Sequence, residues 1–291
     1  MFFDPGITEA LRNALPWAGA FFRAITELGS ELFYVALIMV GYWTYRKRDS
    51  VITAYVLLVS VVTNYWLKLA IANPRPDPSY WYPGVEATNY STPSGHAQNS
   101  SMLFGWIALK ARRVWMTILA VVLVFLIGIS RVYLGVHYLG DVVLGWGIGI
   151  ISVLVLYRLE DPVTRFVSRY RQEYLAIAMF LLGLVLTAVS AYLVPQPPGD
   201  NFGALGGLIM GVAVAFPLED RYVKFSVEPP GGQKWRLVLR ITIGFVMVIG
   251  AMIGLSGVLP SANVWLRSVR YFLVVLLGGF VWPAIFKRLN L

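Results

Sequence analysis

The sequence contains no cysteine, which excludes disulfides, thiolate metal ligands and cysteine nucleophiles together. Charge is also scarce, because charged residues make up only 13% of the 291 positions while apolar residues make up 58%. Soluble domains do not have this balance, so the composition predicts a polytopic membrane protein. The first residues, Met-Phe-Phe-Asp-Pro-Gly, have neither a basic segment nor a small-residue cleavage site after an apolar core, and no removable signal peptide is expected.

Apolar runs of about 17 to 25 residues, the length that crosses a bilayer as a helix, recur along nearly the whole chain. A bilayer supplies no water to an open backbone, so these runs are predicted to be α-helices. The expected fold class is an all-α, polytopic membrane helical bundle. An interfacial helix is expected over residues 5–29, followed by about nine transmembrane helices at residues 30–46, 51–72, 93–113, 114–130, 138–157, 174–194, 202–218, 238–258 and 269–286.

Glycines spaced four apart occur within two of these runs, Gly145 and Gly149 in one and Gly203, Gly207 and Gly211 in another. Small residues at this spacing let two helices approach closely, so we expect packing contacts there. No strong internal repeat is visible, and a transporter built from two inverted halves is therefore not favoured.

Basic residues are distributed unevenly between alternate connections of the nine-helix arrangement. One side holds 17 of the 24 lysines and arginines, and the other holds seven, namely Arg12, Arg23, Lys68, Arg75, Arg131, Arg267 and Arg270. The positive-inside rule places the richer side in the cytoplasm, with the N-terminus outside and the C-terminus inside. The net charge of +9 is thus a mark of topology, and no nucleic acid partner is expected.

Only two histidines are present, His96 and His137, and both fall at the edges of apolar runs on the predicted outer side. Asp141 follows His137 by four residues, so on a helix its carboxylate shares a face with the imidazole and can orient it. Arg131 lies shortly before them. This grouping suits a nitrogen nucleophile that attacks an anionic substrate. The alternative is an interfacial His-Asp pair that only caps a helix.

Two further polar stretches, residues 68–76 and 93–96, fall on the same side. Each has an ordinary explanation: Lys68 as a snorkelling lysine, Arg75 as a lipid headgroup anchor, and Ser94 as the cap of a helix that begins after it. Together they contain the groups that hold a phosphate. Guanidinium and ammonium groups pair with its oxygens, and the backbone N–H groups at a helix start point at an anion.

The pattern Lys-x6-Arg-Pro, Pro-Ser-Gly-His and Ser-Arg-x5-His-x3-Asp resembles the motifs of the type 2 phosphatidic acid phosphatase (PAP2) superfamily, with every motif position filled. The resemblance covers residues 68–141, and the surrounding helices over 51–157 are consistent with the family core. It implies that His137 attacks phosphorus to form a phosphohistidine, that Asp141 orients it and that His96 protonates the leaving oxygen. The groups implied to hold the phosphoryl oxygens are Lys68, Arg75, Ser94, the Gly95 backbone and Arg131.

No metal or other cofactor is implied by the resemblance, and the chemistry agrees. The transition state of phosphoryl transfer spreads charge over the equatorial oxygens, and three cationic side chains can serve where other phosphotransfer enzymes use magnesium. The chain then divides into an N-terminal interfacial segment (1–29), a PAP2-like catalytic membrane core (30–157) and additional C-terminal transmembrane helices (158–291).

The expected function is hydrolysis of a lipid phosphate or diphosphate, such as a polyprenyl diphosphate, a phosphatidate-like lipid or a sphingoid phosphate. Two alternatives within the family stay open, a sugar phosphatase similar to glucose-6-phosphatase and a lipid phosphotransferase, and an anion transporter is a remote third. The site is expected on the non-cytoplasmic face of a plasma or inner membrane. Residues 77–92 are rich in aromatics and fit either a rim at the lipid headgroup level or an ordinary interfacial belt. The sequence does not fix the oligomeric state.

Overall fold

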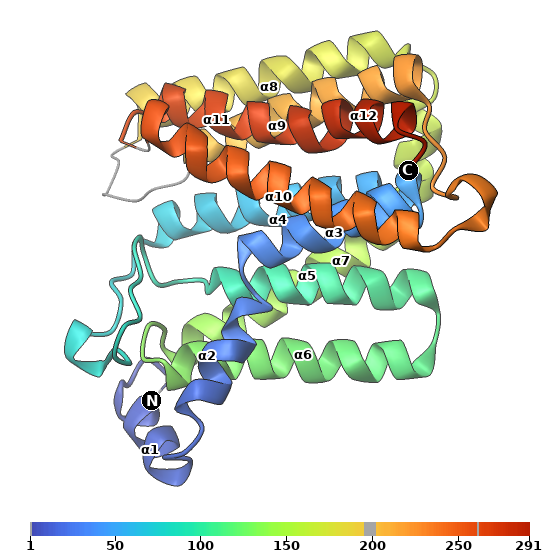
Figure 1. Ribbon diagram of the computed structural model, residues 1–291. Helices are drawn as coiled ribbons and strands as arrows, with labels where there is room; N and C mark the ends of the chain where they lie inside the picture. The colour runs from blue at the N-terminus through green and yellow to red at the C-terminus, as the bar shows by residue number, and fades with distance from the viewer. Residues whose placement is uncertain (1, 195–201, 261) are drawn as a thin grey trace. The chain divides into compact units, whose positions relative to one another are not determined.

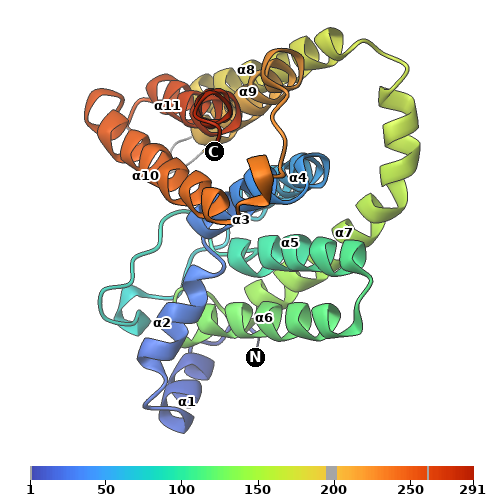
Figure 2. The same ribbon diagram turned by 45° about the vertical axis from the view of Figure 1, so that its right-hand side comes forward.

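The computed structural model describes residues 2–194, 202–260 and 262–291, and these residues form helices joined by loops, with no β-strand among them. The all-α prediction is confirmed. The chain forms two compact units, one made of Met1–Val35 and Tyr55–Pro162 and the other of Ala36–Ala54 and Val163–Leu291. Figures 1 and 2 show the helices of each unit from two directions.

The first unit contains the stretches singled out in the sequence. Its helices are α1 (Gly6–Ala14), α2 (Gly19–Glu27), the start of α3 (Glu31–Thr44), most of α4 (Lys47–Ile71), the short turn η1 (Pro78–Tyr80), α5 (Gly95–Ala111), α6 (Val114–Tyr133) and most of α7 (Leu139–Val167). Helices α5 and α6 lie side by side as an antiparallel pair (Figures 1 and 2). Helices α1 and α2 pack against α6, where the Arg12 Nε donates to the Tyr133 carbonyl at 2.9 Å.

Close contact between α7 and α5 brings the beginnings of these two helices together. A Cβ atom on Gly145 would lie 2.7 Å from the carbonyl oxygen of Ser94, and one on Gly149 would lie 2.5 Å from that of Gln98. Any larger residue would push the helices apart. The packing predicted at these two glycines is confirmed.

A buried polar seam joins α5 to α4. Ser60 Oγ donates to Asn99 Oδ1 at 2.8 Å, and Asn64 Nδ2 donates to Gln98 Oε1 at 3.0 Å and to the Pro93 carbonyl at 3.3 Å. Buried polar groups inside a membrane bundle are stable only when they satisfy one another. The seam therefore fixes the start of α5 relative to α4.

The second unit holds the remaining helices. These are α8 (Gln172–Tyr192), α9 (Phe202–Leu218), the π-helical turn η2 (Glu219–Val223), the short turn η3 (Pro230–Gly232), α10 (Trp235–Val258), α11 (Val264–Leu276), a second π-helical turn η4 (Leu277–Val281) and α12 (Trp282–Arg288). Helices α8, α9 and α11 lie side by side (Figures 1 and 2). A Cβ atom on Gly207 would meet the Ser268 carbonyl oxygen at 2.1 Å, so the predicted close packing extends to this run of glycines.

The predicted number of membrane-spanning helices needs adjustment. Seven of the described helices are long and apolar enough to cross a membrane, or eight if α2 and α3, bent by 48°, form one span. Nine is thus an approximate count. The two predicted spans that do not qualify alone are α3, with 14 residues, and α5, with 17 residues and the polar face described above.

Two predicted boundaries were also wrong. Residues 5–29 form two short helices instead of one, because Pro16 lies between them and cannot continue a helix. Residues 158–167, assigned to a connector, continue α7 as helix. The segment contains Pro162, which disfavours a helix, and an ion pair of 2.8 Å between Lys110 and Glu160 holds the extended end of α7 near α5.

Candidate active site

His137 and Asp141 are buried side by side at the start of α7. His137 is 2% exposed and Asp141 is fully buried, and the imidazole Nδ1 lies 3.3 Å from Asp141 Oδ2. The carboxylate also accepts hydrogen bonds from the Ser91 and Thr92 hydroxyls and from the Tyr138 N–H at 2.8 Å. With an acceptor at Nδ1, we assign the proton of the neutral imidazole to Nδ1, which leaves the lone pair on Nε2.

A tight turn between α6 and α7 carries His137 into this position. Gly135 has φ +76°, in the region that favours glycine, and a Cβ atom there would lie 2.0 Å from the Tyr80 carbonyl oxygen. The turn is fastened by the Tyr82 N–H, which donates to the Leu134 carbonyl at 2.9 Å. The loop before α5 and the turn before α7 are thus held together at the site.

Arg75 faces the free nitrogen of His137. One of its terminal nitrogens, NH1, lies 3.0 Å from His137 Nε2 and donates to the Val136 carbonyl at 2.8 Å. The rest of the guanidinium donates to the carbonyls of Asn89 at 2.8 Å and Thr88 at 2.7 Å. The imidazole is therefore fixed from both sides, by a carboxylate at Nδ1 and a cation at Nε2.

Two more cations are buried in the same region. Lys68, at the end of α4, donates to the carbonyls of Tyr90 and Ser91, the latter at 3.2 Å. Arg131, in the last turn of α6, donates from NH1 to Thr26 Oγ1 at 2.8 Å. Buried charges in a membrane protein are costly and concentrate at functional sites.

The charges act on one another across the site. Burial lowers the pKa of the His137 imidazole, and the positive charges of Arg75, Lys68 and Arg131 lower it further. Burial lowers the pKa of Arg75 to about 10, so Arg75 stays charged at neutral pH. His96, in the first turn of α5, lies within electrostatic range of the same three cations and of His137. The result is a neutral imidazole within a cluster that favours an anion.

Ser94 and Gly95 occupy the start of α5. Ser94 stands at the capping position but its hydroxyl makes no capping bond, so the ordinary explanation of this serine does not hold. Among the described residues, its buried Oγ has no hydrogen-bond partner, and neither has the Nε of Arg131. Buried polar atoms are normally hydrogen-bonded, so both atoms are candidates for contact with a substrate. The Ser94 N–H donates to the Asp141 carbonyl at 3.0 Å, which joins this stretch to the His137 turn.

The fold thus brings the three predicted polar stretches together, and it adds residues that sequence reasoning missed. Ser91 and Thr92 hold the Asp141 carboxylate, and their position directly before Pro93 was the only available signal. Thr26 holds Arg131 from a segment read as interfacial, and nothing in the pattern indicated it. Asn64 Oδ1 would lie 3.1 Å from a Cβ atom on Gly95, so the glycine is required for this close contact.

Comparison with known proteins agrees with these motifs. The PAP2 superfamily model matches residues 49–165, and the model of the PAP2 superfamily phosphatase transmembrane extension matches residues 202–291. Phosphatidylglycerophosphatase B of Bacillus subtilis is 32% identical over 164 residues, which cover 52% of this chain and 79% of that protein. The chain belongs to the PAP2 superfamily.

Other similarities are weaker or cover less of the relative. Sphingosine-1-phosphate phosphatase 1 of mouse is 27% identical over 245 residues, covering 77% of this chain but only 56% of that protein. A crystal structure of a transmembrane PAP2-type phosphatidylglycerolphosphate phosphatase from Bacillus subtilis superposes with a TM-score of 0.46 at 29% identity, covering 55% of this chain and 88% of that one. The predictions of an integral membrane protein and of a PAP2-type phosphatase that hydrolyses phosphate esters or diphosphates are confirmed.

Proposed function

We propose that this PAP2 phosphatase hydrolyses a lipid phosphate or diphosphate through a phosphohistidine at His137. The observation that carries the proposal is the orientation of the ring, with Asp141 at Nδ1 and Arg75 at Nε2. The Nε2 lone pair attacks phosphorus, the bond to the leaving oxygen breaks, and that oxygen takes a proton from His96. Water then attacks the phosphohistidine and gives a proton to His96, and the P–N bond breaks to restore His137.

The phosphoryl group is held by the groups around the ring. Arg75, Lys68 and Arg131 supply positive charge, while the Ser94 hydroxyl and the Gly95 N–H supply donors at the start of α5. The Ser94 Oγ and the Arg131 Nε have no hydrogen-bond partner among the described residues, and this supports their role. We expect the reaction to need no metal, because these cations balance the charge that develops on the phosphoryl oxygens.

A lipid fits the first unit better than a sugar phosphate. A groove of about 370 Å³ with almost purely apolar walls runs between α5, α6 and α7, beginning near Ser101 and Trp146. Along the helix axis, Ser101 lies five positions from His96 and Trp146 lies five positions from Asp141, a rise of about 7 to 8 Å at 1.5 Å per residue. A hydrocarbon tail attached to a phosphate at His137 can enter this groove, whereas a sugar would leave it empty.

The substrate class is tested by phosphate release from purified, chelator-treated protein. The panel contains phosphatidylglycerophosphate, sphingosine 1-phosphate, a polyprenyl diphosphate and glucose 6-phosphate, and we expect higher kcat/KM for the lipids. Preference for glucose 6-phosphate would contradict the lipid assignment. We expect no magnesium requirement, because a magnesium site needs carboxylates as well as substrate oxygens. Activity that is lost in EDTA and restored by magnesium would contradict the metal-free mechanism.

We further propose that the site faces the non-cytoplasmic side of the membrane, on the basis of the basic residue distribution. The natural sequence has no cysteine, so single cysteines can be labelled without background. Ser79 and Ser168 are both exposed and lie on opposite predicted sides. In intact cells, an impermeant maleimide is expected to label Ser79→Cys and not Ser168→Cys. The reverse pattern would place the site in the cytoplasm.

A further inference from the structure

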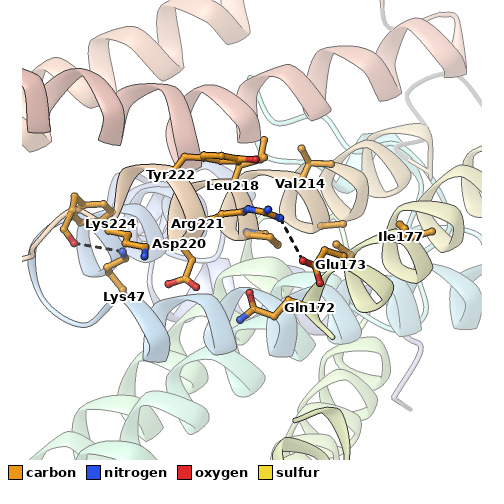
Figure 3. A pocket seen from close by; sticks show the side chains of 14 residues that line it. Lys47, Gln172, Glu173, Ile177, Val214, Leu218, Asp220, Arg221, Tyr222 and Lys224 are labelled. Atoms are coloured by element: carbon orange, nitrogen blue, oxygen red, sulfur yellow. Dashed lines mark hydrogen bonds and ion pairs between the residues drawn. The ribbon is translucent and has the colours of Figure 1, made fainter. Parts of the chain in front are cut away.

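A second cavity, separate from the His137 site, lies within the second unit and has a volume of about 850 Å³ (Figure 3). Its walls come from the start of α4, the start of α8, the end of α9 and the π-helical turn η2. The volume is in the range of small-molecule and cofactor sites. π-Helical turns frequently occur at functional sites, and this one follows Pro217, which interrupts the regular hydrogen bonding of α9.

The cavity has a polar end and an apolar end. Figure 3 shows Lys47 and Lys224 together at one end, Val214 and Ile177 toward the other, and the Asp220 carboxylate between them. The helix ends that form it are those that the basic residue distribution places in the cytoplasm. An amphiphile at the cytoplasmic membrane surface would place its headgroup at the lysines and its hydrocarbon chain along α8 and α9.

The charges of the cavity decide which headgroup it fits. Lys47 Nζ lies 2.6 Å from Glu219 Oε2, a fully buried carboxylate that also accepts a hydrogen bond from the Phe225 N–H at 3.0 Å. The positive charge of Lys47 is therefore neutralised within the protein. Arg221 and Glu173 form an exposed pair at 3.4 Å, which likewise contributes little net charge.

One cation and one carboxylate remain. Within the described part of the chain, neither Lys224 nor Asp220 forms an ion pair, and both are exposed at the polar end of the cavity. A purely anionic headgroup would gain from Lys224 but would be repelled by Asp220. A headgroup that carries both a phosphate and a cationic nitrogen matches both unpaired charges.

We infer that this cavity is a binding site for a zwitterionic phospholipid of the cytoplasmic leaflet. The headgroup lies across the polar end of the cavity, with its phosphate against Lys224 and its cationic nitrogen turned back toward Asp220, and an acyl chain follows the apolar wall of Ala176, Ile177, Ala213 and Val214. The site is independent of the proposed catalytic function, since none of its residues belongs to the His137 cluster.

The test measures lipid binding to the purified full-length protein by native mass spectrometry. The probes are dioleoyl phosphatidylethanolamine, phosphatidylcholine and phosphatidylglycerol, which share their acyl chains and differ only in the headgroup. We expect both zwitterionic lipids to bind about tenfold more tightly than the anionic one, because only they bring a positive charge to the Asp220 carboxylate. Equal affinities for all three, or tighter binding of phosphatidylglycerol, would overturn the inference.

Variants assign the binding to this cavity. Asp220→Asn is expected to abolish the preference for zwitterionic lipids, and Asp220→Lys is expected to reverse it in favour of phosphatidylglycerol. Lys224→Gln is expected to weaken binding of the two zwitterionic lipids about tenfold. Glu228→Gln, an exposed carboxylate of the same connecting segment outside the cavity, is the control and is expected to change nothing. Because all of these side chains are exposed, the variants are expected to fold, and an unchanged preference in Asp220→Asn would place the lipid elsewhere.

Discussion

Arg75 in the first unit and Arg240 in the second are both held by main-chain carbonyl groups, yet they face different neighbours. Arg240 is 2% exposed and donates to the main-chain oxygens of Trp43 at 3.1 Å, Ser226 at 2.9 Å and Leu291 at 3.0 Å. Arg75 has the same kind of support, but its NH1 also lies 3.0 Å from a histidine nitrogen. Arg240 joins chain segments, and Arg75 also places its charge beside the proposed nucleophile, His137 Nε2.

The comparison shows that hydrogen bonds from an arginine to main-chain carbonyls do not by themselves identify a site. Such support only fixes the guanidinium, which any structural or functional role requires. The neighbours decide the role: Arg75 lies beside a neutral imidazole and within electrostatic range of two further cations, Lys68 and Arg131. Variants of these residues can therefore separate loss of chemistry from loss of stability.

Replacing His137 by alanine is expected to have the largest effect. Positioning alone cannot replace a missing nucleophile, so turnover should fall by about 10⁴-fold or more while the Tm stays within a few degrees. Acid-quench trapping with a labelled substrate is expected to show acid-labile phosphate on the wild type and none on His137→Ala. Substantial turnover by a folded His137→Ala protein would contradict the phosphohistidine mechanism.

Arg75→Gln is expected to lower kcat/KM by about 10²- to 10³-fold, since it removes a charge-stabilising donor at the reacting atom. It should also move the pH profile. Arg75 lowers the pKa of His137, so removing its charge raises that pKa, and the acidic limb of kcat/KM shifts to higher pH. Arg75→Lys, which keeps the charge but not the planar set of N–H donors, is the control. We expect it to lose activity as well, but to shift the acidic limb of kcat/KM much less. Identical acidic limbs in all three proteins would argue against the predicted coupling.

The sequence indicated the proposed catalytic and phosphate-binding residues better than the residues that hold them in place. His137 and Asp141 were paired from their four-residue spacing, although His137 lies in the turn before α7 and not on the helix itself. Lys68, Arg75 and Arg131 stood out as cations at the outer ends of apolar runs. Ser91, Thr92 and Thr26 could not be found in this way, because they reach the site through loop geometry and long-range packing. The end of α7 was also missed, since apolar character marks the membrane boundary and not the end of a helix.

Ser94→Ala is expected to have an intermediate effect, a loss in kcat/KM of about 10- to 100-fold from removing one donor to the phosphoryl group. A capping serine would normally contribute about 1 kcal/mol to stability, but this hydroxyl makes no capping bond. The Tm should therefore stay unchanged while activity falls. Ser79→Ala, an exposed serine outside the His137 cluster, is the control. A lower Tm with full activity in Ser94→Ala would show that Ser94 stabilises the fold and does not bind the phosphoryl group.

Arg240→Gln is expected to have the smallest effect on catalysis and a clear effect on stability. The change removes donors from several main-chain oxygens at once, one buried and the others partly buried, so it should cost about 2–4 kcal/mol and lower the Tm by about 5–10 °C. kcat/KM per folded molecule should stay within about twofold of wild type, because Arg240 contacts none of the groups around His137. Arg288→Gln, an exposed arginine of the same unit, controls for the loss of charge and should leave both quantities unchanged. A fall in kcat/KM comparable to that of Arg75→Gln, measured at a temperature where Arg240→Gln is folded, would show that the second unit takes part in catalysis and would remove the distinction between the two arginines.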